Sequence, residues 1–228
     1  MEQRQPIQEP IIIPPSKADQ YLAQRDIEVG LLTNGLQVGF AQRRNCSEFH
    51  PVTAPGYYQW AETNAEIRRS FCGGGQWTLD NPDNRPLIEN AEQKMRFVAA
   101  GGNAATGLEI GTPDVARPKG KATIDSVNAM NSVTISLGLF DLGQVSTNAA
   151  ELPPQGEWLL LYYYDDAAQE LRCEFSRPSA LTDNGKVYAW SVRVLLEAIR
   201  LDSANVQPDL FSSEDDGIDF SISRATGS

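Results

Sequence analysis

The strongest hydrophobic pattern in the chain lies between Gly156 and Ile199 and is typical of β-strands. Short polar breaks divide it into three apolar runs, and such a series predicts an antiparallel β-meander. In the middle run, Leu171, Cys173 and Phe175 alternate with polar residues, so we expect one face of that strand in the core and the other in water. The runs read GEWLLLYYYDD, QELRCEFSRP and GKVYAWSVRVLLEAI.

Helical periodicity is clearest from Tyr57 to Cys72, where Trp60, Ile67 and Phe71 fall on one face. Three glycines follow Cys72 directly, and glycine beyond the last periodic residue is the usual helix stop. We therefore predict a helix over this range.

Weaker patterns predict further elements. Residues 26–41 contain two β-prone runs around Asn34 and Gly35, a pair that suits the positive φ angles of a tight hairpin. Strands are also expected at 94–100 and 132–141, and a short helix at 122–131.

The two ends of the chain differ in composition from its middle. Residues 1–25 form an extended, Pro-rich arm in this prediction, because four prolines surround Ile11–Ile13 and resist helix. We expect the isoleucines to dock on a sheet edge of this chain or of a partner. Residues 203–228 are acidic with few apolar groups and are expected to be a largely mobile tail.

These elements predict an α+β fold. Residues 26–202 are expected to form a single globular domain in which an antiparallel meander sheet packs against one or two helices. A chain of 228 residues is long enough to bury such a core without a disulfide or a structural metal.

Charge restricts the class of partner. The chain has 30 acidic and 19 basic residues and a net charge of −11, a field that repels polyphosphate. Nucleic-acid binding is disfavoured but not excluded, because a basic patch could still be segregated on one face. The acidic residues are scattered along a chain in which 41% of residues are hydrophobic. A role in keeping the protein soluble therefore explains them better than a role as a mimic of DNA phosphate.

Cysteine usage and the leading segment bear on location. Cys46, Cys72 and Cys173 are an odd number without C-x-x-C spacing, which argues against a disulfide framework and a zinc ribbon. The first residues lack the features of an export signal, and no apolar run approaches the roughly 18 residues of a membrane span. We expect a cytoplasmic protein with no membrane contact; the sequence specifies no oligomeric state.

One candidate site consists of Asp83, or Asp80, with Glu92 and Lys94. A carboxylate followed by Glu-x-Lys at a strand resembles the arrangement of metal-dependent nucleases, in which two carboxylates hold Mg²⁺ and the lysine steadies phosphate charge. The pattern is short and has no basic surround, so solvated surface charge is the competing interpretation.

A second candidate is the basic cluster Arg117, Lys119 and Lys121, which could form a cradle for phosphate or carboxylate. A helix beginning nearby would add a favourable partial charge. The spacing does not match the phosphate loop of nucleotide hydrolases, and a solvated loop neutralised by Asp114 and Asp125 is the alternative.

Two other groups favour structural roles. Cys72 and His50 could form a nucleophile and base, but the carboxyl end of a helix disfavours a thiolate, so a buried thiol is the better interpretation. Tyrosines 162–164 could form a platform on which bases stack. Successive residues of a strand face opposite sides, however, which argues against this interpretation.

The leading functional hypothesis is a non-catalytic protein that binds a partner protein, because nucleophile, metal and cofactor signatures are missing. We expect no cofactor. The first alternative is a Mg²⁺-dependent phosphodiester-cleaving enzyme that uses Asp83, Glu92 and Lys94. The second alternative is anion or nucleotide sensing through the loop 101–121.

Overall fold

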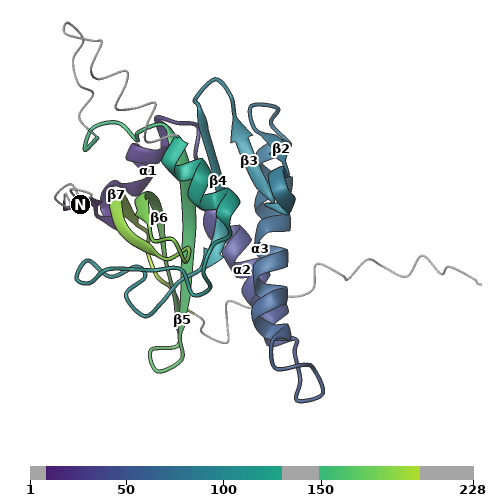
Figure 1. Cartoon of the computed structure of the whole chain (residues 1–228). Helices are drawn as coiled ribbons and strands as arrows, with labels where there is room; N and C mark the ends of the chain where they lie inside the picture. Colours follow the sequence, from purple (N-terminus) through teal and green to yellow (C-terminus); the bar gives the residue numbers. More distant parts are fainter. Residues whose placement is uncertain (1–8, 130–148, 201–228) are drawn as a thin grey trace, which may run out of the picture.

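The computed structural model describes residues 9–129 and 149–200. The described strands form one eight-stranded mixed sheet (Figure 1) with the order β1-β7-β6-β5-β4-β3-β2, and β8 pairs with β6. The strands are β1 (Ile11–Ile13), β2 (Thr78–Asp80), β3 (Leu87–Asn90), β4 (Met95–Gly101), β5 (Gly156–Asp165), β6 (Glu170–Leu181), β7 (Val187–Leu195) and β8 (Ile199–Arg200).

The three strands expected between Gly156 and Ile199 are present as β5, β6 and β7, and they pair antiparallel. The prediction of an antiparallel meander sheet is nevertheless wrong for the whole fold. β4 runs parallel to β5, and β1 runs parallel to β7. The strand expected at 94–100 is confirmed as β4, but periodicity within a strand carries no information about the direction of its neighbours.

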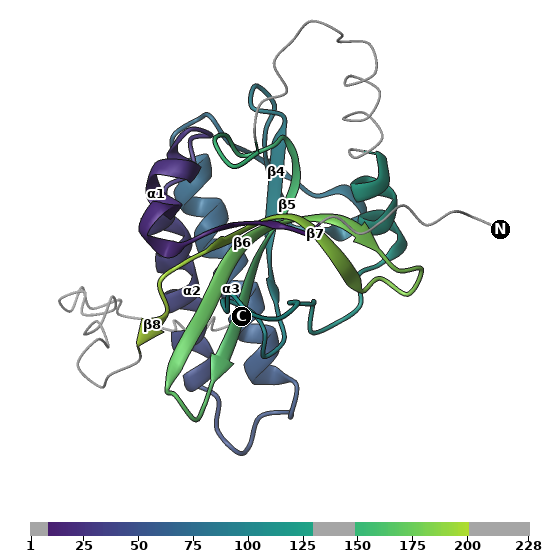
Figure 2. The same cartoon turned by 90° about the vertical axis from the view of Figure 1, so that its left-hand side faces the viewer.

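Helices α1 (Pro15–Ala23), α2 (Val29–Arg44) and α3 (Ala54–Cys72) cover one face of the sheet, as Figure 2 shows. The larger hydrophobic core lies between them and the sheet, and at its centre Phe97 contacts Phe71, Trp77 and Phe175 edge-on. The predicted helix ending at Cys72 is confirmed as α3. Among the described residues, no helix is long and apolar enough to cross a membrane.

The predicted hairpin at 26–41 is wrong, because α2 occupies most of this range. Gly35 does not form a turn. It allows close helix packing, since a Cβ there would lie 2.5 Å from Ile67 Cγ1 on α3. The helical pattern lies instead in Leu32, Leu36 and Phe40, which are spaced by four residues and buried.

The extended arm expected over residues 1–25 is also corrected. Ile11–Ile13 do dock on a sheet edge, as β1 beside β7 of the same chain. The next residues form α1, which begins at Pro15. Proline is well tolerated in the first turn of a helix, where its missing N–H has no intrahelical acceptor in any case, so Pro15 starts this helix.

Described residues of the connection between β4 and β5 pack on the opposite face of the sheet. Residues 121–129 are helical, which agrees with the expected short helix, and they lie on the far side of the sheet from α1, α2 and α3 (Figure 2). Val115 and Val127 of this connection pack in a second core with Leu161 and Trp190. The solvent-facing side predicted for β6 is therefore wrong, and Glu174 on that side is 0% exposed.

Asn64 of α3 takes the place of a neighbouring strand beside β4. β3 pairs with β4 only as far as Phe97. Beyond that point, the Asn64 amide nitrogen donates to Ala99 O at 3.2 Å, and Ala99 N donates to the Asn64 amide oxygen at 3.0 Å. The strand expected at 132–141 and the tail at 203–228 lie outside the described residues.

Candidate functional site

A cavity of about 480 Å³ opens at the carboxyl ends of the parallel strands β4 and β5. Ligands commonly bind beyond the carboxyl ends of parallel strands, and small-molecule sites have volumes of about 300–1,000 Å³. The end of α2, the start of α3, the end of β5 and the loop after β4 meet here. Side chains that matter for its chemistry are Arg43, Tyr57, Gln59, Trp60, Arg117 and Lys119.

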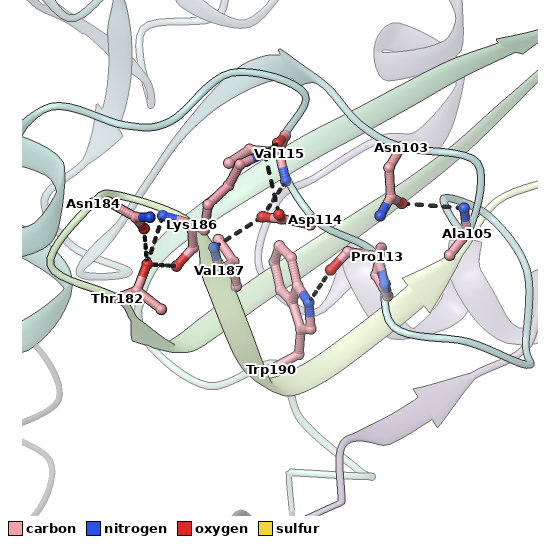
Figure 3. Close-up of polar contacts among 10 residues, drawn as sticks. All are labelled: Asn103, Ala105, Pro113, Asp114, Val115, Thr182, Asn184, Lys186, Val187 and Trp190. Atoms are coloured by element: carbon pink, nitrogen blue, oxygen red, sulfur yellow. Dashed lines mark hydrogen bonds and ion pairs between the residues drawn. The ribbon is translucent and has the colours of Figure 1, made fainter.

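Figure 3 shows how the loop after β4 is fixed to β7 and the turn before it. Asp114 Oδ1 accepts hydrogen bonds from the backbone N–H groups of Val115 (2.7 Å) and Val187 (2.9 Å). Trp190 Nε1 donates to Pro113 O at 2.9 Å, and Lys186 Nζ donates to Val115 O at 2.6 Å. These bonds hold the chain just before Arg117 and Lys119.

A buried ion pair fixes the earlier part of the same loop. Arg193 of β7 pairs with Glu174 of β6. Arg193 also donates to Leu108 O (2.7 Å) and Gly111 O (3.0 Å), and Gly107 N donates to Glu174 Oε2 at 2.9 Å. The loop is therefore bonded to the sheet along most of its length.

The cavity concentrates positive charge in an acidic protein. Arg43, Arg117 and Lys119 line it, and none of its described lining residues is acidic. None of these three cations forms an ion pair with a described carboxylate. Unpaired cations facing a concave space favour binding of an anion.

Gln59 adds a hydrogen-bond donor that lacks a partner. Its side chain is buried, and its Nε2 has no hydrogen-bond acceptor among the described residues. Arg43 Nη1 donates to the Gln59 Oε1 at 3.3 Å, which fixes the amide orientation. A buried donor without a partner costs about 1–3 kcal/mol, and this nitrogen has almost no accessible surface.

Gly101 contributes its backbone to the cavity wall. Successive residues of a strand direct their N–H groups to opposite edges. Ala99 N donates to Asn64 and Gly102 N donates to Tyr162 O on β5, so the Gly101 N–H points away from β5. Ala116 N donates to Gly101 O at 2.8 Å, and Gly101 lines the cavity.

Aromatic side chains form the remaining wall. Tyr57 is 57% exposed and its ring centroid lies 6.1 Å from that of Trp60. The Arg43 guanidinium lies 5.8 Å from the centre of the Tyr164 ring. Burial raises the pKa of Tyr162 above its usual range, although Arg43 and Arg117 act in the opposite direction, so its hydroxyl stays protonated and able to donate.

Lys119 has an unusual amine. Burial lowers its pKa to about 8; Arg85 lowers it further, whereas Glu157 acts in the opposite direction. Glu157 is itself bound by Arg85, Arg96 and Ser126, so it is shared among several donors. The amine therefore exists in both protonation states near neutral pH.

The structure separates the basic cluster expected from the sequence. Arg117 and Lys119 line the cavity. Lys121 does not; it is exposed and forms an ion pair of 3.0 Å with Asp125, as the alternative interpretation held for that residue.

The nuclease candidates lie on two different turns. Asp83 is in the short 3₁₀ segment before β3, whereas Glu92 and Lys94 are in the turn after β3. The strand between them is about 13 Å long at the usual rise per residue. Asp80 ends β2. Within residues 9–129 and 149–200, no group of three acidic, histidine or cysteine side chains could hold a metal ion.

Cys72 and His50 are also apart. His50 lies in the loop before α3, and Cys72 is the last residue of α3, a helix of 19 residues. Such a helix is about 28 Å long. Burial raises the pKa of Cys72, which disfavours the thiolate further.

Three important residues of the cavity were missed from the sequence. Arg43, Gln59 and Gly101 come from three separate elements and have no motif in common. The signal nearest to them was the basic pair Arg43-Arg44, which lies just beyond the range of the predicted hairpin. No protein-family model, curated protein or solved structure matches this chain.

Proposed function

We propose that this protein binds a small organic anion in the cavity at the ends of β4 and β5. The observation that carries the proposal is that the described charged groups lining the cavity are all cations. Arg43, Arg117 and Lys119 all offer positive charge and hydrogen-bond donors, and no acidic side chain is among the described lining residues.

The ligand class follows from the two kinds of wall. A phosphate or carboxylate group would lie among the donors, because such groups accept several charge-assisted hydrogen bonds. A flat ring would lie against Tyr57 and Trp60, since aromatic faces stack well on rings. A nucleotide, or a similar ring-bearing anion, combines both features, which supports anion or nucleotide sensing over phosphodiester cleavage.

Calorimetric titration tests the proposal. Nucleoside monophosphates, aromatic carboxylates and inorganic phosphate would be compared with uncharged nucleosides. We expect binding of at least one ring-bearing anion and none of its uncharged counterpart. Arg117→Gln should weaken that binding about tenfold, because a charge-assisted bond contributes about 1.5–3 kcal/mol.

Lys121→Gln is the matched control, since Lys121 is exposed and outside the cavity. Equal loss of affinity in both variants would reduce the effect to overall charge and count against the site. Failure of every ring-bearing anion to bind would refute the proposal.

A second candidate, binding of a partner protein, is favoured by exposed apolar side chains beside the cavity. Phe49 is 89% exposed and Val52 is 99% exposed in the α2–α3 connection, and Tyr58 of α3 is 41% exposed. Clusters of this kind commonly mark protein contacts. A partner captured from the source cell by the wild type, but lost with Phe49→Ser/Val52→Ser, would support it; capture unchanged by the substitutions would contradict it.

A further inference from the structure

The backbone of Lys119 is held firmly against the turn before β7. Lys119 N donates to Gly185 O at 2.8 Å. A Cβ on Gly185 would lie 1.9 Å from Lys119 O, and Gly185 has a φ of +79°, so only glycine fits this contact. The starting point of the Lys119 side chain is therefore fixed beside the cavity that it lines.

The surroundings of the Lys119 amine favour its neutral form. Arg43 and Arg117 line the same cavity, Arg85 acts on Lys119 as a further positive charge, and no described carboxylate forms an ion pair with Lys119. With a pKa of about 8, roughly one amine in ten is neutral at pH 7. A neutral amine is a nucleophile, and desolvated lysines next to cationic groups are activated in this way.

We infer that Lys119 forms an imine with the carbonyl carbon of an anionic aldehyde or ketone bound in this cavity. The inference rests on the proposed anion binding, which would hold the carboxylate or phosphate of the substrate. Suitable substrates are 2-oxo acids and phosphorylated aldehydes, in which the carbonyl lies a few bonds from the anionic group.

The reaction balances without an oxidant or reductant. The Lys119 nitrogen attacks the carbonyl carbon, and the carbonyl oxygen takes up a proton as the nitrogen releases one. The nitrogen lone pair then forms the C=N bond while the C–O bond breaks, and one water leaves. The departing oxygen takes its second proton from the same nitrogen through water, so amine and carbonyl give imine and water.

Borohydride trapping tests the inference directly. The probe is pyridoxal 5′-phosphate, which carries an aldehyde, a ring and a phosphate. After incubation with the intact protein, reduction and peptide mass spectrometry, we expect one dominant adduct on Lys119. Lys121→Arg should leave its yield unchanged, and Lys119→Arg should abolish it. An adduct spread evenly over exposed lysines such as Lys17, Lys94 and Lys121 would overturn the inference.

A second measurement needs no variant and separates the two proposals. Pyridoxine 5′-phosphate has an alcohol in place of the aldehyde, so it can bind but cannot form an imine. We expect it to bind in calorimetry and to suppress trapping at Lys119. If it binds and the aldehyde gives no Lys119 adduct, the imine is wrong and anion binding stands. If neither compound binds and no Lys119 adduct forms, the imine inference is overturned, and the titration with nucleotides decides separately whether the cavity binds anions.

The yield of trapped adduct should also depend on pH. It should rise between about pH 7 and 9 as the Lys119 ammonium loses its proton. The charged groups that act on it are Arg85 and Glu157. Arg43, Arg117 and the Tyr162 hydroxyl belong to the same cavity. A yield that does not change over this range would contradict the assignment to Lys119.

Discussion

Glu174 and Arg193 are diagonal neighbours across β6 and β7 and form an ion pair of 2.6 Å, with side chains that are 0% and 1% exposed. Arg193 lies opposite Ser176 in the strand register, and Ser176 Oγ donates to Glu174 Oε1 at 2.7 Å. Because both charges are removed from water, each depends on the other and on the loop carbonyls that Arg193 binds. The loop that carries two cations of the cavity therefore depends on this pair.

Replacing Arg193 with methionine should destabilise the protein by about 3–5 kcal/mol, because it leaves the Glu174 carboxylate buried without its partner. Urea denaturation would measure the change. Arg200→Met is the control, since Arg200 is exposed on β8, and it should change stability by about 0.5 kcal/mol or less. Similar values for the two variants would show that the buried pair is not critical.

Gly39→Ala and Gly30→Ala should have opposite effects, although both glycines lie in α2. A Cβ on Gly39 would lie 2.0 Å from Thr63 Oγ1 and 2.5 Å from Gln59 O, so the two helices would have to separate, at a cost of about 1–3 kcal/mol. Gly30 has no atom closer than 3.5 Å, and alanine there should stabilise the helix by about 0.5–1 kcal/mol. Thermal denaturation of the two variants would check the signs, and a stabilising Gly39→Ala would contradict the close contact.

Gln59→Met should separate stability from binding. The substitution removes a buried amide nitrogen that has no described partner, so the free energy of unfolding should stay the same or rise by up to about 1 kcal/mol. Affinity for the anion should change by less than about threefold, because the nitrogen has almost no accessible surface to offer to a ligand. Denaturation and calorimetry on the same samples would measure both. A variant that loses stability and keeps full affinity would assign Gln59 a structural role only.

Lys119→Met should stabilise the protein at pH 7 by about 1–2 kcal/mol, a value reduced from about 1.4 kcal/mol per pKa unit because the lysine is partly exposed. The pKa of Lys119 in the folded protein, about 8, lies below its ordinary value of 10.5. Between these values the unfolded chain binds more protons than the folded one, so wild-type stability gains from rising pH and the advantage of the variant shrinks.

Urea denaturation at pH 7, 8, 9 and 10 would follow that difference. Lys121→Met, which changes an exposed lysine two residues away, should show little difference from wild type at any of these values. An advantage of Lys119→Met that grows with pH would have the wrong sign and would refute the environment described for this amine.

Local patterns predicted the elements whose signals are contained in one segment. α3 followed from its apolar spacing and the glycines after Cys72, and the three strands from Gly156 onward followed from their turns. α2 was missed because Gly35 has two structural uses, in turns and in close helix contacts, and the second depends on Ile67 in another helix. The parallel pairing of β4 with β5 was missed because a connection of more than fifty residues separates them.

The candidate site was predicted only in part for the same reason. Arg117 and Lys119 stand close in the sequence and could be recognised as a pair of cations. Arg43 and Gln59 reach the cavity only because α2 and α3 pack together at Gly39. The absence of acidic side chains among the described lining residues is a property of the assembled fold, which no single segment carries.

The contact of Asn64 with Ala99 bears on how the protein avoids unwanted association. A strand that extends past its neighbour exposes backbone groups that can recruit another chain and start aggregation or strand exchange. The Asn64 amide satisfies both groups of Ala99 from within α3, so the open edge of β4 ends in a side chain and offers no template there. This single amide thus closes the edge at Ala99, and the antiparallel bridge between Gly102 and Val115 continues the protection from Gly101 onward.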